Sequence, residues 1–215
     1  MRWTLPNLLT LARLLAAPAI ALLFALASRP FADWAALTLF LIAAATDWID
    51  GRLARRWGQI TRIGTMLDPI ADKAMVVIAL LVLAAASSLG PWLIVPAALI
   101  LFREVFVSGL REYLGDTGGT LKVTALAKWK TTVQMLAIAV LFAHGVFEHY
   151  FAIGAWGMDA PLVNGILQGT TEDLGFLRLS YRGMVGAGWA GLGLIWIAAL
   201  LTLVTGWDYF RKALP

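Results

Sequence analysis

The sequence predicts an all-α, polytopic membrane protein with six transmembrane helices in a single domain, residues 1–215. Composition gives the first two reasons: 60% of the 215 residues are hydrophobic and only 14% are charged, whereas soluble domains are about 45–50% apolar and about 25% charged. The third reason is that apolar runs of roughly 20 residues recur, each long enough to cross a hydrocarbon core of about 30 Å. These runs leave no room for a sizeable soluble domain.

Six apolar segments follow one another along the chain. They cover residues 7–27, 32–53, 64–86, 91–113, 123–147 and 184–206. An even number of spans places both termini on the same side of the membrane. A long outer connection, residues 148–183, separates the last two spans, and we expect either an interfacial helix or a loose loop there. The C-terminal segment 207–212 is typical of an aromatic and basic interface anchor.

Basic residues are distributed unevenly between the two faces. Of the 17 Lys and Arg residues, only Arg29, Arg178 and Arg182 fall on the face opposite the N-terminus. Because basic loops stay in the cytoplasm, we expect both termini and the loop between the second and third spans to be cytoplasmic. The net charge of +4 is then explained by these loops and by lipid headgroups, and no nucleic-acid partner is expected. The chain has no cysteine, which excludes disulfides and thiolate chemistry.

Four aspartates lie at membrane depth within residues 47–72. Asp47 and Asp50 are three residues apart, and Asp68 and Asp72 are four apart, so each pair shares one face of a helix. Carboxylates in a membrane usually face the bundle interior and carry function, and four together repel one another unless cations lie between them. Oxygen donors with no His or Cys nearby suit Mg²⁺ or Mn²⁺. Two such ions would suit phosphoryl chemistry.

Simpler structural explanations exist for single members of this group. Asp68 before Pro69 is also typical of a helix N-cap with proline in the first turn. Asp50 before Gly51 is also typical of a turn. Neither explanation accounts for two same-face pairs on adjacent spans.

The neighbouring residues suit a phosphate ligand. Gly51 and Ala54 lack bulk and leave room for a pyrophosphate or nucleotide, and Arg55 offers a fork of donors that matches phosphate oxygens. Gly64 has an alternative role in close helix packing. Arg13, inside the first span, is either part of the site or a side chain that snorkels to the interface.

This pattern resembles the full signature of the CDP-alcohol phosphatidyltransferase family. The matching residues are Asp47-x-x-Asp50-Gly51-x-x-Ala54-Arg55, eight residues, then Gly64-x-x-x-Asp68-x-x-x-Asp72. The resemblance extends over about residues 4–145, and it is strongest to bacterial members that use glycerol 3-phosphate as acceptor. It implies the family's fold, a homodimer, and a multi-pass protein of the bacterial cytoplasmic (inner) membrane whose active site faces the cytoplasm. The long outer connection is a departure, on the face away from the aspartates.

The resemblance also implies a reaction. The phosphatidyl group of CDP-diacylglycerol would pass to sn-glycerol 3-phosphate, giving phosphatidylglycerophosphate and CMP. Two Mg²⁺ or Mn²⁺ ions would be held by Asp47, Asp50, Asp68 and Asp72, and Asp72 would also be the general base. The expected CDP-diacylglycerol contacts are Asn7, Thr10, Arg13, Gly51, Ala54, Arg55, Thr61 and Gly64.

Glycerol 3-phosphate is a dianion and needs a cationic pocket of its own. The candidates are Arg103, Arg111, Lys128 and Lys130. An alternative for Arg103 is an internal ion pair with Glu104, although adjacent residues on a helix do not face each other. Each of the four is alternatively an ordinary positive-inside charge.

Three rival functions share some of these features. A sister enzyme with inositol phosphate, serine or phosphatidylglycerol as acceptor has the same signature. A divalent-cation channel or transporter would use the aspartates for selectivity, but Arg55 and the clustering of carboxylates at one membrane face argue against it. A non-catalytic lipid-binding scaffold would have no need for four carboxylates.

Overall fold

The computed structural model describes residues 4–57, 61–114 and 125–213, and it describes all of their side chains except those of residues 48, 50–56, 125–128 and 213. The helices in this part of the chain are α1 (Leu5–Leu26), α2 (Phe31–Trp57), α3 (Arg62–Ala86), α4 (Pro91–Leu114), α5 (Ala125–Gly154), α6 (Ala160–Gln168) and α7 (Leu177–Ala213). No strand occurs among the described residues. The predicted all-α class is confirmed.

The helix boundaries follow local chain chemistry. Pro6 lies in the first turn of α1, where its ring fits a helix. Thr61 caps α3, and its hydroxyl accepts a hydrogen bond of 3.1 Å from the N–H of Gly64. Asp68 lies inside α3, so its alternative explanation as a helix cap is wrong. α6 ends at Gly169, whose φ of +85° is the left-handed conformation that glycine adopts without strain.

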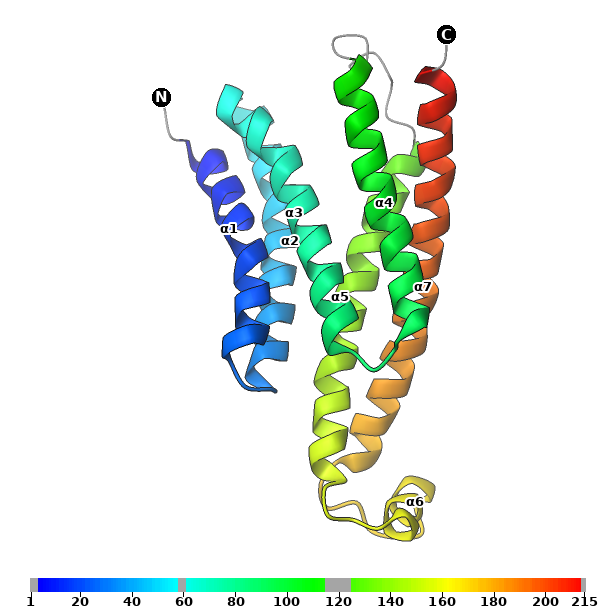
Figure 1. Cartoon of the computed structure of the whole chain (residues 1–215). Helices are drawn as coiled ribbons and strands as arrows, with labels where there is room; N and C mark the ends of the chain where they lie inside the picture. Colours follow the sequence, from blue (N-terminus) through cyan, green and yellow to red (C-terminus); the bar gives the residue numbers. More distant parts are fainter. Residues whose placement is uncertain (1–3, 58–60, 115–124, 214–215) are drawn as a thin grey trace.

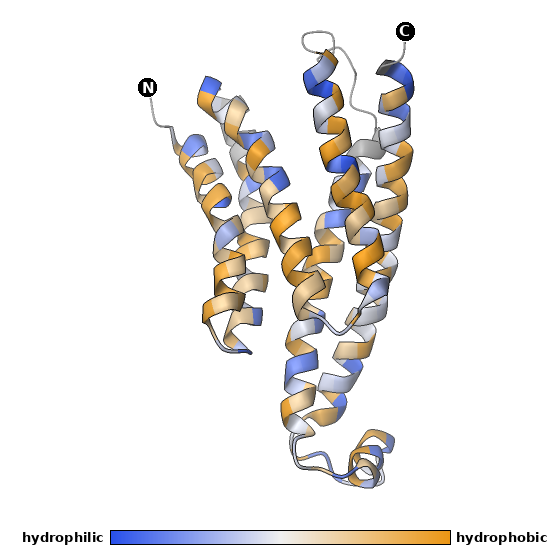
Figure 2. Ribbon diagram, viewed as in Figure 1, coloured by the Kyte–Doolittle hydropathy of each residue, from blue (hydrophilic) through white to orange (hydrophobic). Residues whose placement is uncertain are grey.

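Five of the described helices are long and apolar enough to cross a membrane: α1, α3, α4, α5 from Trp129 onward, and α7. Hydrophobic residues dominate the middle turns of α3 and α4 (Figure 2). These helices indicate a multi-pass membrane protein. α2 covers the predicted span 32–53 but is not among the five, so the number of six spans stays a prediction.

The helices form a bundle in two packed groups. α1 packs against α2 and α3, while α7 packs against α5 and α4, and contacts of α2 with α5 and of α3 with α4 join the groups. α1 begins and α7 ends at the same end of the bundle, which we call the terminal end (Figure 1). The turns from α1 to α2 and from α3 to α4 lie at the opposite end, the distal end. The terminal end therefore also holds the end of α2 and the start of α3.

The distal end is more helical than the sequence predicts. α5 and α7 continue past the turns of the other helices, and α6 lies beyond them (Figure 1). The predicted connection 148–183 consists largely of the end of α5, the nine residues of α6 and the start of α7. An interfacial helix was one of the two expectations for this connection; α6 is a helix there, and its position at the membrane interface stays a prediction.

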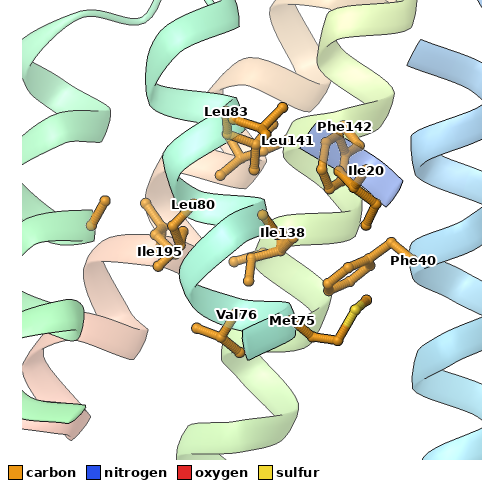
Figure 3. Close-up of a cluster of buried hydrophobic side chains, with 14 of the residues drawn as sticks. Ile20, Phe40, Met75, Val76, Leu80, Leu83, Ile138, Leu141, Phe142 and Ile195 are labelled. Carbon is orange, nitrogen blue, oxygen red and sulfur yellow. The ribbon is translucent and has the colours of Figure 1, made fainter. Parts of the chain in front are cut away.

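The core lies where α3 and α5 meet the other helices (Figure 3). Leu80 and Leu83 of α3 and Leu141 and Phe142 of α5 are buried there. The ring of Phe142 packs against that of Phe40, with 5.8 Å between the ring centroids. Because lipid tails are as apolar as leucine, burial within a membrane stabilises mainly through close packing rather than through removal from water. The fit of these side chains therefore holds the two groups of helices together.

A bidentate ion pair closes the turn between α1 and α2. Nε and Nη2 of Arg29 each donate a hydrogen bond of 2.7 Å to the carboxylate of Asp33, and Nη2 also donates to the carbonyl oxygen of Gly145 in α5, at 3.2 Å. The hydrogen bond with Asp33 raises the pKa of Arg29 above its ordinary value. The pair is worth more than an exposed one because Asp33 is buried. It fixes this turn to α5 at the distal end.

The core packing predicts a contrast between two adjacent leucines. Leu80 is 0% exposed, whereas Leu81 is 61% exposed on the outside of the bundle. We expect Leu80→Ala to lower the free energy of unfolding by about 2 kcal/mol, because it leaves a cavity that the helices fill only in part. Leu81→Ala is the matched control and should change it little. Thermal unfolding in detergent measures both, and equal melting temperatures for the two variants would contradict this account of the core.

Candidate active site

Three carboxylates from two helices meet at the guanidinium of Arg13 in α1. Its Nη1 forms ion pairs with Asp47 of α2 and, at 3.2 Å, with Asp72 of α3, and its Nη2 lies 3.5 Å from Oδ1 of Asp68. The side chain of Arg13 is 3% exposed, while those of the three aspartates are 47%, 49% and 55% exposed. We call these four residues the acidic cluster. The snorkelling explanation of Arg13 is wrong, because its charge is held inside the bundle.

The carboxylates are spaced around a guanidinium rather than gathered on one point. Among the described side chains, no group of three His, Asp or Glu residues is close enough to hold a metal ion. The side chain of Asp50, the fourth predicted ligand, lies outside the described residues, as do those of Gly51, Ala54 and Arg55. The backbone places all four in the last two turns of α2.

One face of α1 carries a row of buried polar residues against α3. Asn7, Thr10 and Arg13 follow one another at intervals of three, so they share this face, and all are buried. The Thr10 hydroxyl lies 2.8 Å from Oδ1 of Asp68, within hydrogen-bond reach, and 3.1 Å from the carbonyl oxygen of Pro6. This hydroxyl therefore orients the Asp68 carboxylate.

The same face of α1 approaches the start of α3 closely. The hydroxyl of Thr61 donates a hydrogen bond of 2.8 Å to Oδ1 of Asn7. A Cβ atom on Gly64 would lie only 2.8 Å from that oxygen and 3.3 Å from the Thr61 hydroxyl. Gly64 therefore serves close helix packing here, which was one of its two expected roles. The structure brings Asn7, Thr61 and Gly64 together beside the acidic cluster.

A small pocket of about 70 Å³ lies next to the acidic cluster. Arg13, Asp47 and Asp72 line it, together with Thr131 and Met135 of α5. Thr131 directly follows Lys130 in the chain. The pocket thus connects the aspartates with the part of α5 that carries a predicted acceptor-binding residue.

A second polar group, which we call the basic cluster, consists of Arg103, Glu104 and Lys130. Nη1 of Arg103 donates a hydrogen bond of 3.1 Å to Oε1 of Glu104, and Lys130 donates to the same oxygen. Arg103 and Lys130 are both buried. The expectation that Arg103 and Glu104 do not pair is wrong, because Oε1 of Glu104 accepts from Arg103 as well as from Lys130 of α5. One carboxylate is thereby shared by two cations.

A chain of hydrogen bonds links the two clusters. Lys73, which directly follows Asp72, donates a hydrogen bond of 2.6 Å to the hydroxyl of Ser108, and that hydroxyl donates to the carbonyl oxygen of Glu104 at 2.5 Å. α3 and α4 are therefore tied together between the acidic and the basic cluster. Lys73 and Ser108 were not among the predicted site residues. A charged residue within an apolar span, directly after Asp72, is a signal that could have found Lys73, whereas nothing in the sequence around Ser108 distinguishes it from an ordinary helix position.

The remaining two candidates for acceptor binding are Arg111, whose side chain is described, and Lys128, whose side chain is not. Nη2 of Arg111 donates a hydrogen bond of 2.8 Å to the hydroxyl of Tyr209 in α7. Tyr209 is buried, so the expectation that segment 207–212 is only an interface anchor is wrong for this residue. The side chain of Lys128 lies outside the described residues.

Comparisons with known proteins agree with the motif. The family model described as CDP-alcohol phosphatidyltransferase matches residues 3–162. A protein of Cereibacter sphaeroides named CDP-diacylglycerol–glycerol-3-phosphate 3-phosphatidyltransferase is 56% identical over 220 aligned positions, which cover 100% of this chain and 97% of that protein. Proteins of the same name from Shigella flexneri and Escherichia coli strain K12 are 40% identical over 165 positions, covering 75% of this chain and 90% of theirs. This chain belongs to the CDP-alcohol phosphatidyltransferase family.

Proposed function

We propose that this chain transfers the phosphatidyl group of CDP-diacylglycerol to the 1-hydroxyl of sn-glycerol 3-phosphate, releasing CMP and forming phosphatidylglycerophosphate for phospholipid biosynthesis. The observation that carries the proposal is the meeting of Asp47, Asp68 and Asp72 at the buried Arg13. The Cereibacter sphaeroides relative, which matches this chain from end to end, is named for the same reaction.

The proposed setting is the bacterial cytoplasmic (inner) membrane, with the terminal end in the cytoplasm. α2 is the sixth span in this proposal, because its apolar residues between Asp33 and Asp47 pack against α1 and α5. The basic residues of the terminal end, such as Arg111 and Arg211, favour this orientation. A homodimer is expected from the family resemblance.

The chemistry of the acidic side chains fits two divalent cations, Mg²⁺ or Mn²⁺. The described carboxylates of the acidic cluster are half exposed, they offer only oxygen donors, and they already gather around one positive charge. The residues proposed to hold the ions are Asp47, Asp50, Asp68 and Asp72. When bound, such ions neutralise negative charge on the pyrophosphate and on the leaving CMP.

CDP-diacylglycerol is proposed to lie across α1, α2 and α3 at the acidic cluster. The planar guanidinium of Arg13 presents several donors that match phosphate oxygens. The hydroxyl of Thr10 keeps the carboxylate of Asp68 oriented. Beside it lie the hydrogen-bonded side chains of Asn7 and Thr61. The further proposed contacts are Gly51, Ala54, Arg55 and Gly64.

In the proposed reaction, the 1-hydroxyl oxygen of the acceptor forms a bond to the phosphorus that carries diacylglycerol. The bond from that phosphorus to the bridging oxygen breaks, and this oxygen leaves with CMP. Asp72 accepts the hydroxyl proton as general base. Asp72 and Thr131, the residue after Lys130, both line the pocket at the acidic cluster, and the acceptor hydroxyl is proposed to enter it there.

The basic cluster suits the phosphate of the acceptor. Arg103 and Lys130 share a single carboxylate, that of Glu104, so the cluster retains a net positive charge. Arg111 and Lys128 complete the proposed binding site. A phosphate dianion suits this site better than the zwitterionic serine does.

The first test is acceptor dependence. With purified protein in detergent, CDP-diacylglycerol and Mg²⁺, we expect CMP release only when glycerol 3-phosphate is added. Serine, inositol phosphate and phosphatidylglycerol should support less than a tenth of that rate, and a chelator should abolish release until Mg²⁺ or Mn²⁺ is restored. Dependence on another alcohol would assign the chain to a sister enzyme. No release with any alcohol would sink the proposal and leave the channel or scaffold.

The second test concerns the general base. Asp72→Asn should lower turnover by about 10²–10⁴-fold, because the amide does not accept the hydroxyl proton. Binding of CDP-diacylglycerol, measured by thermal stabilisation, should largely survive. The matched control is Asp159→Asn at the N-terminus of α6, where asparagine caps a helix as well as aspartate does. Turnover of Asp72→Asn within a few-fold of the wild type would refute the base assignment.

A further inference from the structure

α7 contributes side chains to both arginines of the proposed acceptor site. Nη2 of Arg103 lies 3.4 Å from the hydroxyl oxygen of Thr205, and Nη2 of Arg111 donates to the hydroxyl of Tyr209 at 2.8 Å. The guanidinium of Arg111 also stacks over the ring of Tyr209, 5.0 Å from its centroid. The family match ends at residue 162, before α7 begins at Leu177. These contacts therefore come from a helix outside the matched region.

The local geometry leaves the hydroxyl oxygen of Thr205 ready to accept. The Thr205 hydroxyl donates its proton within α7, to the carbonyl oxygen of Leu201 at 2.8 Å or of Thr202 at 3.0 Å. Its oxygen is then available to accept from Arg103. Thr205 and Tyr209 are four residues apart, so they share one face of α7, and both are buried.

Gly206 lets the stem of Arg103 lie directly against this helix. A Cβ atom at Gly206 would be 3.0 Å from Cγ of Arg103, closer than nearly all real contacts. A methyl group there would require Cγ of Arg103 to move by a few tenths of an ångström. The position of Arg103 therefore depends on the lack of a side chain at Gly206 as well as on the hydroxyl of Thr205.

An arginine needs this support because its side chain has many rotamers. When a ligand must fix such a side chain, the loss of rotamer freedom weakens binding. An arginine that is already held binds the phosphate without that cost, and the reacting hydroxyl is placed more accurately. Support from α7 thus acts on acceptor binding rather than on the acidic cluster.

We propose that Thr205, Gly206 and Tyr209 are positioning residues that hold Arg103 and Arg111 in the orientation that binds the phosphate of the acceptor alcohol. The inference rests on the proposed function in one respect, the assignment of Arg103 and Arg111 to the acceptor. It adds one helix, α7, to the acceptor site, which is then built from α4, α5 and α7.

The main test is Gly206→Ala, with Gly193→Ala as the matched control in the same helix, where an added Cβ meets nothing within 4 Å. Gly206→Ala should raise the KM for glycerol 3-phosphate about 10-fold, with kcat changed less and the KM for CDP-diacylglycerol unchanged. Gly193→Ala should leave all three constants unchanged. A Gly206→Ala enzyme with unaltered acceptor KM, or with both KM values raised equally, would overturn the inference.

Three variants test the hydroxyl groups separately from packing. Thr205→Val keeps the shape of the side chain and removes the oxygen that accepts the hydrogen bond from Arg103, whereas Thr205→Ser keeps the hydroxyl. Tyr209→Phe removes the hydroxyl beneath Arg111 and keeps the ring. We expect Thr205→Val and Tyr209→Phe to weaken glycerol 3-phosphate binding several-fold in isothermal titration, and Thr205→Ser to bind like the wild type. Equal binding by the Val and Ser variants would contradict a positioning role for Thr205.

Arg103→Met separates failure of this inference from failure of the proposed function. If Arg103→Met binds glycerol 3-phosphate as well as the wild type does, the acceptor site itself is misassigned, and the role of α7 is overturned with it. If Arg103→Met loses binding while the Gly206 and Thr205 variants keep it, only the role of α7 is overturned. If the wild type binds no glycerol 3-phosphate, both are overturned.

Discussion

The requirement to balance a buried arginine organises the terminal end of this protein. A guanidinium inside a membrane bundle is costly unless it is paired, and Arg13 is surrounded by carboxylates from α2 and α3. The same carboxylates would repel one another without a cation among them. The arginine therefore offsets the repulsion between the carboxylates, and the carboxylates offset the cost of burying the arginine. These interactions hold α1 against α2 and α3. The polar row of Asn7, Thr10 and Arg13 extends this contact along α1.

The two polar clusters are parts of one connected arrangement. Asp72 faces Arg13, and the next residue, Lys73, reaches Ser108 and through it the backbone of Glu104. Glu104 then holds Arg103 and Lys130. The Lys73–Ser108 hydrogen bond thus opposes a displacement of α3 relative to α4, which would change the distance between the two clusters. Such a connection suits a reaction in which two bound molecules must meet with accurate orientation.

The sequence predicted those features that depend on local spacing or on the cost of charge in a membrane. Helices follow from long apolar runs, and the same-face spacing of the aspartates follows from helical periodicity. The meeting of the carboxylates at Arg13 was not predicted, because Arg13 was expected only as a CDP-diacylglycerol contact or as a snorkelling side chain. Hydropathy alone does not report which charged side chain in one span faces a charge in another.

Other features depend on contacts that no local pattern encodes. Glu104 meets Lys130 26 residues later, and Arg103 meets Thr205 102 residues later. Spacing rules argued against the Arg103–Glu104 pair, because they ignore the reach of long side chains. The lengths of α5 and α7 were underestimated because their distal turns are only moderately apolar. The predicted spans 123–147 and 184–206 include only the strongly apolar residues, but the helices continue beyond them.

The length of α7 has a practical consequence. Its 37 residues measure about 55 Å, more than the about 40–45 Å of a bilayer with its headgroups. Together with α5 it forms a helical stalk at the distal end, remote from the acidic cluster at the terminal end (Figure 1). An antibody fragment or a rigidly fused domain attached to this stalk would give electron cryomicroscopy a fiducial mark, which so small a membrane protein otherwise lacks.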